Sequence, residues 1–255
     1  MFWICTHHRS GTVLMRNVFQ RYAALTNRPF FKGKYEQCPE GVELYQDAHS
    51  HTRLPDEAHG IHLFRDPYAL LLSHVRYHLI TESPGEPPNA VVMSDGRLYG
   101  EHLREKASLE EMAFFELEQI YRLTLSDMLA WDYSDARFIN VPLDAFDNSG
   151  SAIVVARWLR ARFDDFDADE SALEDAFRHV IANQPLKRRH GTRREGEDPQ
   201  RLLTPAVTDY MQREFPRLQD LQRRAEDALA EVQRELAASA DSSGPDPRAE
   251  EPPTA

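Results

Sequence analysis

The chain has 255 residues, of which 41% are apolar and 28% charged, and its formal net charge is −12. This length and apolar content predict one main domain, with room for a small helical subdomain. The acidic charge argues against a general nucleic-acid binder, because its field would oppose the phosphate contacts that dominate such affinity. No apolar stretch approaches the roughly 20 residues that span a bilayer, so no membrane span is expected.

The cysteines and the first residues indicate a reducing compartment. Cys5 and Cys38 cannot build a disulfide framework and lack the spacing of metal ligands. The apolar residues 1–5 run directly into polar ones, without a basic start, a long apolar run or a cleavage site. A cytoplasmic location is therefore expected.

In chain order, the first part of the sequence alternates short apolar runs with helical patterns. Strands are predicted at residues 1–5, 41–49 and 60–64, and helices at 11–25 and across 69–79. Asp66 is expected to cap the second helix, because Pro67 suits a first helical turn. Residues 83–88 are rich in turn formers and predict a surface loop.

The second part of the sequence adds a strand and several helices. A long helix is predicted over 109–129, with Ser108 and Glu111 as a capping box. A strand at 137–141 and helices at 151–163, 205–215 and 218–238 follow, before a polar segment, 239–255, that is expected to be disordered. The alternation predicts an α/β fold, an open and mostly parallel sheet with helices on both faces.

The predicted domain organisation is an α/β domain over 1–218, a C-terminal helix over 219–238 and a tail over 239–255. The apolar stripe of the C-terminal helix is partial. This helix is therefore expected either to dock on the domain or to pair with a second copy in a homodimer.

The sharpest local pattern is the segment 7–14, between the first strand and the first helix. Exposed amides at a helix start, the positive end of its dipole and a glycine for close approach together suit a phosphate. Arg9 would add a fixed charge aimed at the same oxygens. An ordinary helix cap is the alternative interpretation. The earlier glycine and the lysine of a nucleoside triphosphate loop are missing, and the shorter loop suits a phosphosulfate better.

Two motifs resemble the sulfotransferases that use 3′-phosphoadenosine 5′-phosphosulfate (PAPS). The run Arg9-Ser10-Gly11-Thr12 is similar to their 5′-phosphosulfate loop. Residues 61–78 are similar in order and spacing to their second motif, a strand end and the following helix. An arginine and a serine of that motif hold the 3′-phosphate, and Arg65 and Ser73 take these places. The resemblance extends over most of 1–218. It implies PAPS as co-substrate, and it implies nucleotide contacts from the residues at these positions: Arg9, Ser10, Gly11, Thr12, Val13, Arg65 and Ser73.

A third and looser match lies in the basic cluster 187–194. The family closes over the nucleotide with a late arginine and glycine loop, which Arg189 and Gly191 resemble. Because the spacing departs from the common form, Arg193 is an alternative contact for the 3′-phosphate.

The resemblance also implies roles in catalysis. Arg9 and the amides of residues 10–13 are expected to stabilise the leaving phosphate, because preorganised donors usually supply the largest catalytic contribution. His49 or His51 occupies the place of the family's general base. His7 and His8 could join these two as metal ligands, but no cysteine or carboxylate pattern accompanies them, and no metal is predicted.

The acceptor is not specified by the sequence. A small molecule or glycan carrying a hydroxyl or an amine is expected, and the insert 81–106 is a candidate lid over it. Two other functions remain open: a small-molecule kinase with a related phosphate loop, and a protein that binds 3′-phosphoadenosine 5′-phosphate without catalysis.

Overall fold

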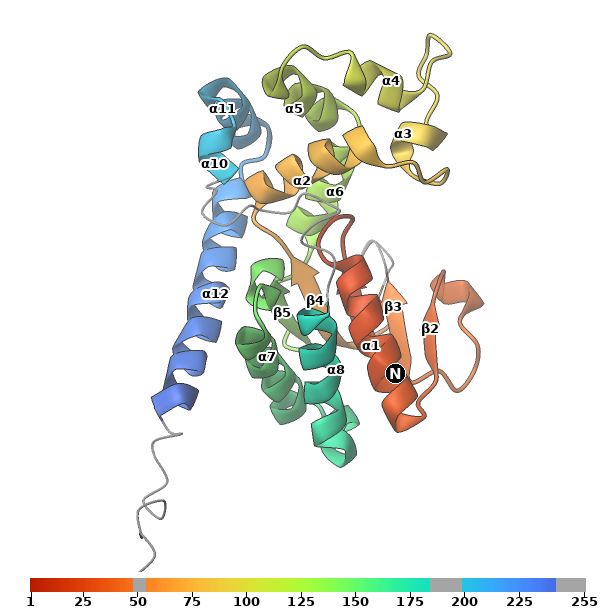
Figure 1. Ribbon diagram of the computed structural model, residues 1–255, viewed down its shortest axis with the longest axis vertical. Coiled ribbons are helices and arrows are strands. Elements are labelled where there is room, and N and C mark those ends of the chain that lie inside the picture. Colours follow the sequence, from red (N-terminus) through yellow and green to blue (C-terminus); the bar gives the residue numbers. More distant parts are fainter. Residues whose placement is uncertain (48–53, 184–198, 242–255) are drawn as a thin grey trace, which may run out of the picture.

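The computed structural model describes residues 1–47, 54–183 and 199–241, and its centre is a parallel sheet (Figure 1). The five strands stand in the order β2-β3-β1-β4-β5, and every neighbouring pair is parallel. They span Phe2–Thr6 (β1), Phe30–Lys32 (β2), Leu44–Asp47 (β3), His59–Phe64 (β4) and Phe138–Pro142 (β5).

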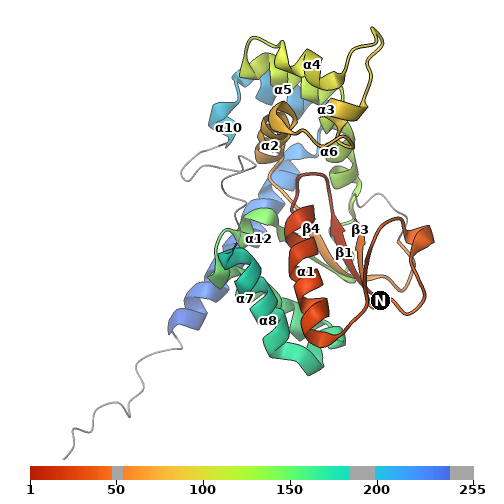
Figure 2. The same ribbon diagram turned by 45° about the vertical axis from the view of Figure 1, so that its right-hand side comes forward.

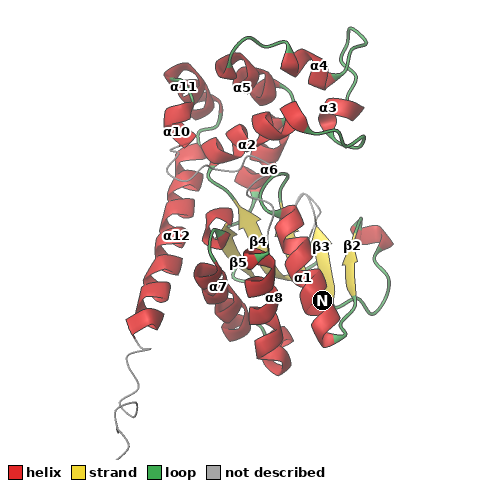
Figure 3. Ribbon diagram, viewed as in Figure 1, coloured by secondary structure: helices red, strands yellow, loops and turns green. Residues whose placement is uncertain are grey.

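Helices pack against this sheet, and others lie beyond its carboxyl edge (Figure 3). Their bounds are Thr12–Thr26 (α1), Pro67–Ile80 (α2), Pro87–Ala90 (α3), Tyr99–Arg104 (α4), Leu109–Glu118 (α5), Tyr121–Ala130 (α6), Ser149–Arg162 (α7), Glu170–Ala182 (α8), Pro199–Leu202 (α10), Pro205–Glu214 (α11) and Leu218–Asp241 (α12). Short 3₁₀ turns occupy Tyr35–Gln37 (η1), Leu143–Phe146 (η2) and Asp164–Asp169 (η3).

The two faces of the sheet are covered differently, as the alternating side chains of β1 illustrate. Phe2 and Ile4 belong to a core that includes residues of α1, α7 and α8. Trp3 belongs to a smaller aromatic core on the other face, where η1 contributes Tyr35 and the end of α6 leads into Trp131. Burial on both faces explains why β1 is apolar without alternation.

A second helical layer lies beyond the carboxyl edge of the sheet. Helices α2, α5, α6 and α11 and the first part of α12 share a core of buried side chains, among them Leu71, Leu117, Leu125, Met211 and Leu221. The loop between β1 and α1 points toward this layer and lies under α2 in both views (Figures 1 and 2). The site described below lies where the two layers meet.

Helix α12 packs along the rest of the chain. Docking on the domain was one of the two arrangements predicted for it. Leu218 and Leu221 are buried in the core of the helical layer, whereas Val232 is buried in the sheet core. Trp158 of α7 donates a hydrogen bond of 2.6 Å to Glu235. Among the described residues, no helix is both long and apolar enough to cross a membrane.

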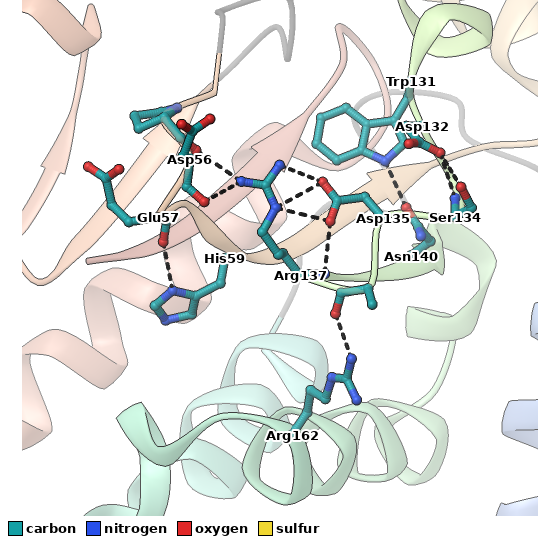
Figure 4. Close-up of polar contacts among 12 residues, drawn as sticks. Asp56, Glu57, His59, Trp131, Asp132, Ser134, Asp135, Arg137, Asn140 and Arg162 are labelled. Atoms are coloured by element: carbon teal, nitrogen blue, oxygen red, sulfur yellow. Dashed lines mark hydrogen bonds and ion pairs between the residues drawn. The ribbon is translucent and has the colours of Figure 1, made fainter.

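Arg137 fastens the amino end of β5 to the segment before β4. Its guanidinium contacts both carboxylate oxygens of Asp135 at 2.7–3.1 Å. It also donates to the carbonyls of Pro55 at 3.1 Å and Asp56 at 2.6 Å (Figure 4). This network closes the amino edge of the sheet, opposite the edge that carries the site.

The predicted α/β class, parallel sheet and helical C-terminal region are confirmed, whereas some boundaries differ. Strand β2 was not predicted, and the helix expected over 109–129 is two helices. The first of these ends at the C-cap Gln119, with φ −104° and ψ −78°, and the hydroxyl of Tyr121 in the next helix donates to the Pro67 carbonyl at 2.6 Å. Helix α12 continues to Asp241, into the segment expected as a tail, and residues 242–255 lie outside the described part of the chain.

Candidate functional site

The strands β1 and β4 are neighbours whose connections leave in opposite directions. β1 continues through α1 toward β2 at one edge of the sheet, whereas β4 continues through α2 toward β5 at the other. Open parallel sheets bind ligands at such a switch point, outside the carboxyl ends of the strands. The loop after β1 and Arg65 after β4 both lie at this position.

The backbone of the β1–α1 loop is bent sharply. Arg9 has φ 64° and Gly11 has φ 101°, both in the region that favours glycine. Gly11 is the N-cap of α1, so no side chain of that residue caps the first-turn amides. A Cβ at Gly11 would lie 2.8 Å from Leu143 Cδ1 and 2.9 Å from Leu63 Cδ2. Backbone strain at a residue such as Arg9 is typical of functional loops.

Hydroxyl groups inside the loop hold its shape. Ser10 Oγ accepts from the His7 amide at 2.7 Å and donates to the His7 carbonyl at 2.9 Å. Thr12 Oγ1 lies 2.9 Å from Thr6 Oγ1. The Ser10 amide donates to the His7 carbonyl at 3.0 Å. Ser10 therefore braces the loop, and the predicted contact of Ser10 with a phosphate would require these bonds to be exchanged.

Arg9, Arg65 and Ser73 form one cluster. Arg9 Nε donates to Ser73 Oγ at 3.3 Å, and Arg65 Nη1 donates to the Arg9 carbonyl at 3.4 Å. Arg65 and Ser73 are each only 2% exposed. Two separate phosphate positions were expected from the motifs, but the structure brings their residues into direct contact. Both bonds are near the outer limit of hydrogen-bond length, so oxygens of an anion could replace these partners.

Positive charge is concentrated in this cluster. Burial, together with repulsion by Arg65, lowers the pKa of Arg9 to about 10, so Arg9 remains charged at neutral pH. Its guanidinium lies 4.0 Å above the ring centroid of Tyr77, a cation–π contact that fixes the side chain. Val13, whose amide was predicted to contribute, lies in the first turn of α1 with its side chain 44% exposed.

A buried polar chain connects the loop to β5. Trp131 Nε1 donates to Asn140 Oδ1 at 2.9 Å, and His62 Nδ1 lies 2.9 Å from the same oxygen (Figure 4 draws the tryptophan contact). Because an amide oxygen only accepts, His62 Nδ1 is the donor. Burial, with His7 nearby, holds the pKa of His62 well below its ordinary value. The neutral His62 ring then accepts at Nε2 from His7 Nε2, at 2.9 Å.

A second group of histidines was missed by the sequence reasoning. His8 was grouped with His7, but its ring packs against His74 and His78 of α2. Glu116 of α5 is buried with them, and its Oε1 accepts from His78 Nδ1 at 2.6 Å. Burial opposes ionisation of Glu116, but the neighbouring rings lower its pKa below the ordinary value. The spacing of four residues on α2 was the available sequence signal.

Several predicted residues lie outside the described part of the chain. These are the candidate bases and the basic-cluster contacts, namely His49, His51, Arg189, Gly191 and Arg193. Comparison with family models, curated proteins and solved structures finds no match.

The first prediction concerns the bend at Gly11. Gly11→Ala should lower the free energy of unfolding by about 1–3 kcal/mol through backbone strain, with overlap against Leu143 and Leu63 added to it. Gly41→Ala is the matched control, since Gly41 has φ 78° but no heavy atom within 4 Å of an added Cβ. Urea denaturation should show the larger loss for Gly11→Ala. Equal losses would mean that Leu143 and Leu63 accommodate the extra carbon.

The second prediction concerns pH. In the unfolded chain His62 takes up a proton near pH 6.5, whereas the folded chain keeps it neutral to a lower pH. Stability should therefore fall as the pH drops from 7.5 to 5, and it should fall less in His62→Gln. His179→Gln, at an exposed position of α8, is the control. Parallel pH profiles of the wild type and His62→Gln, from thermal unfolding, would contradict this.

Proposed function

We propose that the chain is a sulfotransferase that moves a sulfuryl group from PAPS to a hydroxyl or amine of a small molecule or glycan. The observation that supports this most is the contact of Arg9, Arg65 and Ser73 at the switch point of the sheet. These three residues come from two motifs separated by more than fifty positions. Because they lie together at one edge of the sheet, a single nucleotide with phosphates at both ends of its ribose could contact all three.

The proposed reaction is an in-line transfer. The acceptor oxygen or nitrogen loses a proton and attacks the sulfur, the bond between sulfur and the bridging phosphate oxygen breaks, and 3′-phosphoadenosine 5′-phosphate leaves. Charge accumulates on the leaving phosphate, as in phosphoryl transfer. Arg9 is assigned to this phosphate. An arginine keeps its proton, so its role is charge stabilisation and not proton donation.

The burial of Arg65 suits the 3′-phosphate. A guanidinium that is 2% exposed has lost most of its hydration, so a dianionic partner would gain more from it than from a surface arginine. Ser73 lies two turns into α2 and offers a hydroxyl beside it. In this proposal, the phosphate oxygens replace the long contacts that now join these residues to Arg9.

A phosphate-transferring enzyme is the less favoured alternative. The loop has an arginine before Ser10 and no lysine before the helix, so the usual contact with a triphosphate is missing. A protein that only binds the spent nucleotide shares the whole anion site with the proposed enzyme. The presence of a general base distinguishes the proposed enzyme from the binding protein. Both candidate bases belong to residues 48–53, outside the described part of the chain.

The third prediction tests the 3′-phosphate site. In calorimetry, 3′-phosphoadenosine 5′-phosphate should bind much more tightly than AMP, and Arg65→Ala should weaken it by about 2 to 4 kcal/mol. Arg65→Lys keeps the charge but loses the planar fork, and we expect an intermediate affinity. Arg234→Ala, exposed on α12, controls for the change in net charge. Equal affinities for the two nucleotides would remove the 3′-phosphate site.

The fourth prediction concerns the base. His49→Ala or His51→Ala should reduce sulfuryl transfer while nucleotide affinity stays unchanged, because a base acts on the acceptor and not on the nucleotide. The acceptor is first identified by incubating the protein with PAPS and a metabolite extract and searching for masses raised by one sulfuryl group. Full activity of both variants would reject a histidine base at these positions.

A further inference from the structure

Three histidine rings meet between the β1–α1 loop and α2. His8 belongs to the loop, and His74 and His78 lie one turn apart on α2. One ligand nitrogen from each residue lies within 4.8 Å of the other two. The ring centroid of His8 is 4.9 Å from that of His74 and 5.6 Å from that of His78.

We propose that His8, His74 and His78 bind one divalent transition-metal ion, with Zn²⁺ the best match, and that Glu116 orients the site. Imidazole nitrogen is a preferred ligand of zinc, and three histidines with one open position form a common tetrahedral arrangement. The proposal does not rest on nucleotide binding. None of these four residues is assigned a role in the sulfotransferase reaction above.

The two α2 histidines are buried, and several of their ring nitrogens lack a hydrogen-bond partner among the described residues. His74 and His78 are 0% exposed. Neither nitrogen of His74, nor Nε2 of His78, has a hydrogen-bond partner among the described residues. A buried polar atom without a partner is costly, and coordination of a metal would satisfy it. One nitrogen of each of these two rings belongs to the group of ligand atoms that also includes His8.

Glu116 supplies the support that metal-binding histidines usually have. Its Oε1 accepts from His78 Nδ1 at 2.6 Å, which fixes the tautomer that leaves the His78 Nε2 lone pair for the ion. Its Oε2 lies 3.8 Å from His74 Nδ1. The Glu116 carboxylate is 0% exposed, so it interacts with protein groups and not with solvent.

The geometry requires a small closure. Two nitrogens bound to a tetrahedral zinc at about 2.1 Å are about 3.4 Å apart, so the widest pair would approach by at most about 1.4 Å. His8 can supply this movement, because it lies in a loop and its side chain is 20% exposed. Glu86 Oε2 lies 3.8 Å from His8 Nε2, on the His8 side of the cluster.

The charges around the cluster are compatible with a cation. Arg9 opposes the binding of a cation, because its positive charge acts on His74. The carboxylate of Glu116 contacts His78 and that of Glu86 lies near His8, and both offset that repulsion. A bound ion would also join the loop to α2 immediately beside Arg9, and so hold the loop in the observed position.

The fifth prediction tests this site with the full chain, without a histidine tag and after dialysis against a chelator. Calorimetry with Zn²⁺ should show one ion per chain, and Co²⁺ should give the visible absorption of a tetrahedral site. His8→Ala should weaken zinc binding by at least about tenfold, and Glu116→Gln by about 10- to 100-fold.

His59→Ala is the matched control, because the His59 side chain is 30% exposed and pairs with Asp165, away from the cluster. It should bind zinc like the wild type. Circular dichroism checks that each variant is folded, and His8 is chosen first because it is the least buried ligand. Absence of stoichiometric zinc binding, or unchanged affinity in folded His8→Ala, would overturn the proposal, whatever the result with nucleotides.

Discussion

Two like charges are held close together at the carboxyl edge of the sheet, and the surrounding structure serves to keep them there. Arg9 and Arg65 repel each other, and that repulsion contributes to the lowered pKa of Arg9. Serine or aspartate at an N-cap satisfies a first-turn amide with its side chain, whereas glycine, which is also accepted there, does not. The chain has Gly11 there instead, with Arg9 in a strained conformation before it. This arrangement holds two positive charges beside a helix start that has no side-chain cap from its N-cap residue.

The sequence predicted an element where its burial or its capping residue can be recognised from neighbouring residues alone. β1 and β4 are buried almost throughout, so an apolar run predicts them, and Asp66 before Pro67 does accept from the Ala69 amide at 2.8 Å. β2 has three residues and depends on β3 for its pairing, so no periodicity could predict it. The break after α5 contains neither glycine nor proline, so no helix-breaking residue marks it in the sequence.

The site was predictable in part for the same reason. Spacing within a motif brought Arg65 and Ser73 together, since eight residues from a strand end lead two turns into a helix. The direct contact of Arg9 with both depends on how α2 crosses the loop, which no local pattern encodes. His7 and His8 show this limit most clearly. They are adjacent in sequence, yet one bonds to His62 of the sheet and the other packs on α2.

The path of α12 has a consequence for folding. Its first residues complete the core of the helical layer, whereas Val232 completes the sheet core. One helix thus packs into both hydrophobic clusters, which favours a single cooperative unfolding transition over independent unfolding of two subdomains. Because α12 follows every other described element in the sequence, neither hydrophobic cluster is complete during synthesis until α12 has left the ribosome. The nascent chain must therefore keep exposed apolar surface from aggregating until late in its synthesis.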